Sequence, residues 1–413
     1  MGPTTLFDKS FLQSLTVDES VWFDHFFITN VCPLFYVETL ADLDKKMKTR
    51  SAEREVAIIA GKFPEMHGMP NAHHVGLCLR DLLGDAVPMT GQIYITGGHP
   101  VNVGGTTGTV VEQSPEAEAF LRWQKGEFLN VERQFARAWR DGLAALPLTG
   151  VAERFREMGI DAKLCRSMKD AKALAENFVS GSVDSFAQLQ VALYFQQVPV
   201  QWHSRILRRW SQAGRPALAV FAPYASYVLS VELFFHVAVA ANHISGERSS
   251  NLVDISYLFY LPFCMMFVSN DRLHQKCAPL FLRGDQEFVW GLGLKGGLTE
   301  LNSHYQQLPD EVKQAGVYSF ADGPARVGSC FVAKLHERLL LKSWEWFPER
   351  KERSSPETGE DGPPTAEEIQ RMAEAPGVPS VDLAEGRTYN DRFVIEHRAT
   401  TKKGSWHQIP KDA

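Results

Sequence analysis

The chain has 413 residues, of which 44% are hydrophobic and 22% are charged. This length suits two or three domains, or one domain with large insertions, and the composition excludes collagen-like, coiled-coil and wholly disordered chains. The formal net charge is −6, so no overall basic field attracts nucleic acid. Contact with a polyanion would therefore depend on a local basic patch.

The negative charge comes from one segment, residues 349–386. This segment holds ten acidic and four basic residues, whereas the rest of the chain has 39 of each sign. It also contains five prolines and four glycines, a composition typical of a disordered linker. We predict a disordered acidic linker at 349–386, followed by a C-terminal tail at 387–413.

Six cysteines are scattered along the chain, and none forms a Cys-x-x-Cys pair. Their number and spacing favour neither a zinc ribbon nor a secreted disulfide scaffold. The first eight residues contain no basic segment and no long apolar run, so they do not read as a signal peptide. A reduced, cytoplasmic setting is the simplest interpretation.

Residues 1–48 show the pattern of an α/β core. Leu6-Phe7 and Phe26–Cys32 are short apolar segments, of the kind that form buried strands. From Leu34 to Lys48 the apolar residues follow helical spacing instead. We expect this region to be the first part of the core.

Residues 49–214 have a different pattern, in which amphipathic helices prevail. A Gly-rich stretch predicts one β-hairpin, between residues 92–95 and 108–111. Ser114-Pro115 is a typical helix start, and we expect that helix to continue to about Leu146. The region is therefore predicted to be a mostly helical insertion with a small β-hairpin region.

The most apolar part of the chain is 217–268. Its two runs, Ala217–Ala241 and Leu252–Val268, are compatible with a transmembrane hairpin, so a membrane-associated protein is one alternative. Glu232 and Asp254 would be costly in lipid. We favour an interpretation without membrane contact, in which a buried helix is followed by a buried parallel strand.

Five acidic residues either follow a predicted strand or lie on a helix expected at the same end of the sheet. They are Asp8, Glu38, Asp42, Asp254 and Asp271. In an open parallel sheet the carboxyl ends of neighbouring strands form one crevice, so we expect Asp8 and Asp271 to meet there. Plainer roles stay open: Asp8 and Asp254 as helix caps, Glu38 and Asp42 as surface partners of nearby lysines, and Asp271 as a turn residue.

Carboxylates that share a crevice raise each other's pKa, because like charges at short range are unfavourable. A divalent cation resolves this conflict, and all-oxygen ligand sets suit Mg²⁺ or Mn²⁺. Two such ions about 4 Å apart can activate a water molecule and stabilise the leaving oxygen of a phosphodiester. The acidic residues therefore predict a metal centre that hydrolyses phosphodiesters.

Asp8-Lys9-Ser10, then Glu38, Asp254 and finally Ser269-Asn270-Asp271 resemble the motif pattern of PIN-domain nucleases. The resemblance covers residues 5–48 and roughly 215–300. It implies a three-layer α/β/α sandwich with a central parallel sheet, built from residues 1–48 and 215–348. It also implies a Mg²⁺- or Mn²⁺-dependent endonuclease, most often an endoribonuclease that cleaves RNA rather than DNA.

The resemblance assigns roles to individual residues. The implied catalytic and metal-binding residues are Asp8, Glu38, Asp254 and Asp271, with Asp42 as a further candidate ligand. Substrate contacts are expected beside them. The candidates are Lys9, Ser10, Ser269, Arg272 and Lys276, and His274 belongs to the same basic run.

Two features depart from the family pattern, namely Lys9, where the family has a small hydroxyl residue, and the long insertion at 49–214. Lys9 keeps a second interpretation open, because its ammonium could stand in for a metal charge. The chain would then be a catalytically inactive PIN-like scaffold that acts as an interaction module. The sequence also leaves open whether the chain acts alone, forms a homodimer or is restrained by an inhibitory protein partner.

Overall fold

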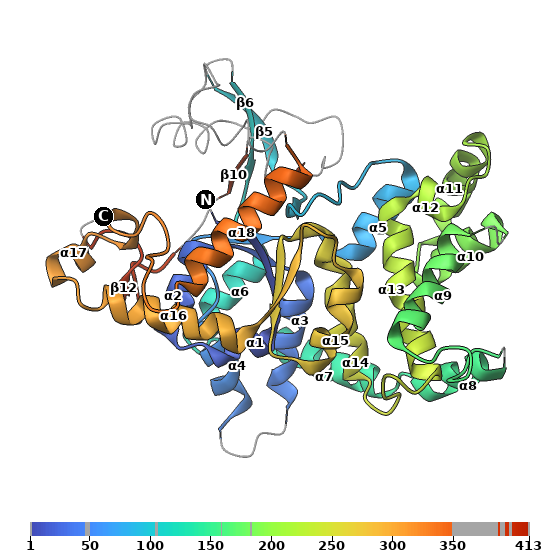
Figure 1. Cartoon of the computed structure of the whole chain (residues 1–413), viewed down its shortest axis with the longest axis horizontal. Helices are drawn as coiled ribbons and strands as arrows, with labels where there is room; N and C mark the ends of the chain where they lie inside the picture. Colours follow the sequence, from blue (N-terminus) through green and yellow to red (C-terminus); the bar gives the residue numbers. More distant parts are fainter. Residues whose placement is uncertain are drawn as a thin grey trace.

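The computed structural model describes residues 2–45, 50–103, 106–157, 159–181, 184–348, 387–388, 393–395 and 399–411. The predicted linker at 349–386 lies outside the described residues. The described part is a mixed α/β structure with a five-stranded parallel sheet and a group of helices beside it (Figure 1).

The sheet joins segments that lie far apart in the sequence. Its strands, in spatial order, are β3 (Gly68–Pro70), β2 (Ile28–Val31), β1 (Thr4–Phe7), β7 (Met266–Ser269) and β8 (Glu287–Trp290). All four pairings are parallel. The three central strands are buried along their whole length, although β1 and β2 each contain two polar residues.

Helices connect the strands, and the first helix after each of β1, β2, β7 and β8 begins near the carboxyl end of that strand. Those before β3 are α1 (Lys9–Ser14), α2 (Val17–Phe26), α3 (Pro33–Leu40), the 3-10 helix η1 (Ala41–Asp44) and α4 (Ala52–Ala60). Those around β7 and β8 are α14 (Ser250–Ser256), η2 (Tyr257–Phe263), α15 (Arg272–Phe281) and α16 (Gly291–Tyr305). Asp8 caps α1 and Asp271 caps α15, so both helices start at the edge where the acidic residues were expected.

The group of helices beside the sheet is built around α13 (Pro223–Ala240), which is almost entirely apolar. The others are α5 (His74–Leu83), α8 (Leu148–Glu157), α9 (Met168–Ser180), α10 (Ser185–Phe195), α11 (Val200–Gln212) and α12 (Leu218–Phe221). Figure 1 shows α8 to α13 on the side away from α17 and the C-terminus. Among the described residues, α13 is the one helix long and apolar enough to cross a membrane, and 78% of it is buried within the protein.

Three details differ from the expectations. The helix expected from Ser114 to Leu146 is two helices, α6 (Pro115–Gln124) and α7 (Asn130–Ala144), because Gly126 adopts a φ of +77° between them. The predicted hairpin pairs different residues. It is formed by β5 (His99–Val103) and β6 (Thr106–Val111), and residues 94–95 form β4, which pairs instead with β9 (Arg387–Thr388).

The third difference is β3, which lies inside the expected insertion, so the sheet includes residues beyond 48.

The C-terminal part returns to the N-terminal core. It contains α17 (Asp310–Gln314), the 3-10 helix η3 (Val317–Ser319), α18 (Phe331–Trp346), β10 (Phe393–Ile395), β11 (Lys402–Lys403) and β12 (Trp406–His407). The indole of Trp406 is fully buried against Trp22, and both indole N–H groups donate to Asn302 Oδ1. Lys403 forms a buried ion pair with Glu65, 3.2 Å apart.

Candidate functional site

The acid cluster lies at the carboxyl edge of the sheet. Phe7 of β1 is opposite Val268 of β7, so Asp8 and Ser269, the residues that follow them, are neighbours. The side chain of Ser269 donates to Asp8 Oδ2 at 2.8 Å. The backbone register therefore brings the first and last acidic motifs together, as expected from the sequence.

The carboxylate of Asp8 is already saturated with hydrogen bonds. Its Oδ1 accepts from the Phe11 N–H at 2.9 Å, and its Oδ2 accepts from the Ser10 hydroxyl at 2.7 Å as well as from Ser269. His274 Nδ1 lies 3.3 Å from the same Oδ2. Burial alone would raise the pKa of Asp8, but the hydrogen bond and charge of His274 outweigh it and lower that pKa.

His274 is the counter-ion of Asp8. Its ring is fully buried, with Nε2 2.7 Å from the main-chain oxygen of Asp254 and Nδ1 2.8 Å from Ser269 Oγ. Burial lowers the pKa of His274, but the Asp8 carboxylate raises it by a larger amount, so the pKa is about 9. His274 is thus an internal imidazolium and not an exposed phosphate contact. Because Ser269 is also buried, the Asp8–His274–Ser269 group offers no nucleophile to a substrate.

Lys9 occupies the second acidic motif. Its ammonium lies 3.1 Å from Glu38 Oε1, 3.0 Å from Asp42 Oδ2 and 3.2 Å from the main-chain oxygen of Glu38. Desolvation by burial lowers its pKa, but the charges of Glu38 and Asp42 more than compensate, so the pKa is raised. The ammonium points into this group and is not presented to a ligand.

The remaining oxygens of these two carboxylates are bonded too. Tyr257 donates its hydroxyl to Glu38 Oε2 at 2.8 Å. Arg140 of α7 lies 3.2 Å from Asp42 Oδ1. Asp42 is only 3% exposed, so it is an integral part of the cluster and not the surface acid that the sequence left open.

Asp254 and Asp271 are the two acids of the cluster whose carboxyl groups form no ion pair with the described residues. Asp271 uses Oδ1 to cap α15, accepting from the Leu273 N–H at 2.6 Å, and no hydrogen bond to its other oxygen exists within the described ranges. The Asp254 carboxyl has no hydrogen bond or ion pair with any residue that the structure describes. Burial, together with the charges of Glu38, Asp271 and Asp8, raises the pKa of Asp254 to about 7.

Two exposed cations lie next to this open half of the cluster. Arg272 and Lys276 are on the first turns of α15, directly after Asp271, and both are exposed. Their i, i+4 spacing places them on one helix face. Ser10 and Ser269, in contrast, are committed to Asp8, and the Ser10 oxygen also accepts from the Asn270 N–H at 3.1 Å.

The acids fit one divalent ion better than two. Across the ranges that the structure describes, no group of three or more His, Cys, Asp or Glu side chains is placed to hold a metal ion. A two-ion site would require Lys9 to release Glu38. A single Mg²⁺ is commonly held by one or two carboxylates together with water and substrate phosphate, so Asp254 and Asp271, which have no ion pair among the described residues, are the candidates for such a site.

Sequence reasoning missed the roles of three residues in this cluster: His274, Tyr257 and Arg140. His274 lies one helical turn after the residues of the Ser269-Asn270-Asp271 motif, and this spacing was the signal that its ring could turn back toward Asp8. Tyr257 and Arg140 carry no such signal. Their contacts to Glu38 and Asp42 join residues 219 and 98 positions apart.

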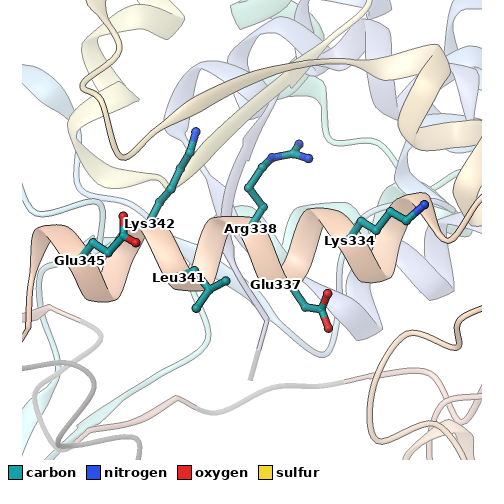
Figure 2. A pocket seen from close by; sticks show the side chains of 6 residues that line it. All are labelled: Lys334, Glu337, Arg338, Leu341, Lys342 and Glu345. Atoms are coloured by element: carbon teal, nitrogen blue, oxygen red, sulfur yellow. The ribbon is translucent and has the colours of Figure 1, made fainter.

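A separate shallow pocket lies on α18, away from the acids. Figure 2 shows that its lining comes from one side of this helix: Lys334, Glu337, Arg338, Leu341, Lys342 and Glu345. Arg338 and Lys342 both pair with Glu287 at 2.7 Å. None of the predicted site residues lines this pocket, so it does not compete with the acid cluster as the candidate site.

No protein-family model, no curated protein and no solved structure matches this chain. The case for a function therefore rests on the geometry of the acid cluster and on the residues around it.

Proposed function

We propose that the chain is a PIN-like hydrolase of nucleic-acid phosphodiesters, with a three-layer α/β/α core and RNA as its substrate rather than DNA. Asp254 and Asp271 would hold one Mg²⁺ or Mn²⁺ ion. The parallel sheet with β1 at its centre, and the acids at the carboxyl ends of β1 and β7, support this assignment.

The observation that carries the proposal is the state of Asp254. The residue is partly buried, and its carboxyl has no partner among the described residues. Burial is the main cause that raises its pKa to about 7, and the charges of Glu38, Asp271 and Asp8 add to it against the opposing charge of His274. Burying a charge without a partner is costly, and Asp254 differs from other unpartnered acids in belonging to the acid cluster at the carboxyl ends of β1 and β7. A divalent cation supplies the missing partner.

Each residue of the cluster then has a distinct task. The ion, when bound, would polarise the phosphodiester and activate water. Arg272 and Lys276 would attract and orient the phosphates through charge. His274 and Lys9 neutralise Asp8 and Glu38 from within, so the cluster does not accumulate negative charge that would repel the substrate.

The test is Mn²⁺-dependent cleavage of labelled single-stranded RNA and DNA by the full chain and by Asp254→Asn and Asp271→Asn. Both variants should lose at least tenfold in rate. Asn can still cap α15, so loss of activity in Asp271→Asn would not reflect loss of the helix. Asp310→Asn, at an exposed acid of α17 that pairs with Lys313, is the matched control and should keep full activity. Unchanged cleavage by both site variants would refute the proposal.

One observation favours a second candidate function, a catalytically inactive PIN-like scaffold that acts as an interaction module. Lys9 and His274 already neutralise the acids of two motifs, which a scaffold without metal would need. Calorimetric titration with Mn²⁺ separates the two candidates. Binding that disappears in Asp254→Asn supports the hydrolase, and a wild-type chain that binds no Mn²⁺ supports the scaffold.

A further inference from the structure

The environment of the Lys9 ammonium is complete. An ammonium has three N–H donors, and three oxygens lie within 3.0–3.2 Å of it: Glu38 Oε1, Asp42 Oδ2 and the main-chain oxygen of Glu38. Lys45 reaches the same Asp42 only at 3.8 Å, from a side chain that is 49% exposed. Lys9 is therefore the buried partner of this acid pair, and Lys45 is a peripheral one.

The three oxygens are held in place by groups other than Lys9. Tyr257, which is fully buried, donates to Glu38 Oε2. Arg140 donates to Asp42 Oδ1 at 3.2 Å and to the Ala41 main-chain oxygen at 2.6 Å. Without the ammonium, two carboxylate oxygens and one carbonyl oxygen would still face the same point. These are the hard oxygen ligands that Mg²⁺ and Mn²⁺ prefer.

We infer that Lys9 is a resident cation, which occupies a position where Glu38 and Asp42 would otherwise bind a divalent metal ion. The cluster therefore has two cation positions, one filled by a side chain of the protein and one left open at Asp254 and Asp271. This inference rests on the proposed function only for the open position. The site vacated by Lys9 is defined by its own three oxygens.

The test removes the ammonium and supplies a metal in its place. Lys9→Ala should unfold at a lower temperature than the wild type in metal-free buffer, and millimolar MnCl2 should recover most of that loss. Counting bound Mn²⁺ by electron paramagnetic resonance should give one more ion per chain in Lys9→Ala than in the wild type. Lys45→Met is the matched control and should match the wild type in both measurements.

The extra ion should depend on the acids around Lys9. The triple variant Lys9→Ala/Glu38→Gln/Asp42→Asn should not gain the ion, although it removes the same ammonium. An equal Mn²⁺ count in the wild type and Lys9→Ala, with no recovery of the unfolding temperature, would overturn the inference. If the wild type binds no Mn²⁺ but Lys9→Ala binds one, the proposed function fails and the inference stands.

A measurement on the wild-type chain tests the inference even if Lys9→Ala does not fold. Acylation by an amine-reactive reagent, read by mass spectrometry, should label the exposed Lys45 and leave Lys9 unlabelled, both with and without Mg²⁺. If Mg²⁺ exposes Lys9 to the reagent, the metal displaces the ammonium and Lys9 is not a resident cation.

Discussion

Two carboxyl groups at opposite ends of the strands, one buried and one partly buried, have contrasting environments. Glu65, just before β3, is 5% exposed and is contacted by Lys403, Thr400, Gln124 and Gln408. Burial raises its pKa, but the Lys403 charge and these hydrogen bonds lower it overall. Asp254, at the carboxyl edge, has no side-chain partner in the described ranges and a raised pKa. The fold saturates the carboxylate it uses for structure and leaves open the one we assign to function.

The largest expected effect is a loss of stability when the buried Glu65 carboxylate loses its ion-pair partner. Lys403→Met removes the ammonium from the buried Glu65 carboxylate, and removing one member of a buried ion pair typically costs about 3–5 kcal/mol. Urea unfolding should show this loss. Lys402→Met, at the adjacent exposed lysine, should change stability by less than about 0.5 kcal/mol. Equal effects of the two substitutions would mean that Glu65 does not depend on Lys403.

Glu232 on α13 tests whether an unpartnered carboxyl alone marks a functional site. Its Oε2 is buried without a hydrogen bond among the described residues, and burial raises its pKa from 4.5 to about 8. The folded state then binds more protons than the unfolded state between these values, so stability falls as pH rises from about 4.5 to 8. Glu232→Gln should remove this dependence and gain about 2–4 kcal/mol at pH 9.

Because Glu232 lies apart from the acid cluster, Glu232→Gln should leave Mn²⁺ binding unchanged. The measurement is urea unfolding between pH 5 and 9 together with Mn²⁺ titration. A loss of Mn²⁺ binding would show that Glu232 influences the acid cluster from within the group of helices.

Asp254→Asn should also increase stability at high pH, by a smaller amount than Glu232→Gln. The unfolded carboxyl ionises near pH 3.8 and the folded one near pH 7, so its contribution to stability is lost as pH rises through this range. In metal-free buffer at pH 8 the variant should be more stable than the wild type by about 1–3 kcal/mol. With Mn²⁺ present, the wild type should recover this difference and the variant should not respond. A destabilised variant would mean that Asp254 has a structural partner.

Ser10→Ala gives the smallest expected change. It removes two hydrogen bonds, the one that Ser10 donates to Asp8 and the one that it accepts from the Asn270 N–H. Asp8 keeps the Phe11 N–H, Ser269 and His274. Loss of these two bonds costs about 1–2 kcal/mol, and thermal unfolding should report it. A loss above about 3 kcal/mol would mean that the Asp8 carboxylate or the Asn270 N–H is left without a replacement partner.

The sequence predicted the central strands and the meeting of Asp8 with the Ser269-Asn270-Asp271 motif, because short apolar segments that end on polar residues are typical of buried parallel strands. The hairpin partner of residues 92–95 was wrong, since strand pairing in a Gly-rich stretch is weakly specified by side-chain pattern. The break at Gly126 was also missed, because a positive φ at one glycine leaves no trace in helical periodicity.

The open and closed halves of the acid cluster were less predictable. The motif spacing placed the acids near one another but could not say which of them a side chain would neutralise. Lys9 was noted as a departure from the family pattern, and the idea that its ammonium stands in for a metal charge remains a prediction. The contacts of Lys9 with Glu38 and Asp42 depend on how α3 and η1 pack near the end of β1, and local sequence propensity does not determine this packing.

Trp406 and Lys403 have a consequence for the order in which the protein is made. Both complete packing that begins near the N-terminus, against Trp22 and Glu65, and Lys403 is 338 positions from Glu65. During translation Trp22 and Glu65 are made long before Trp406 and Lys403, so their packing partners are absent until β11 and β12 have been synthesised. Contacts between residues so far apart in the sequence form slowly, so we expect this part of the core to be completed late in folding.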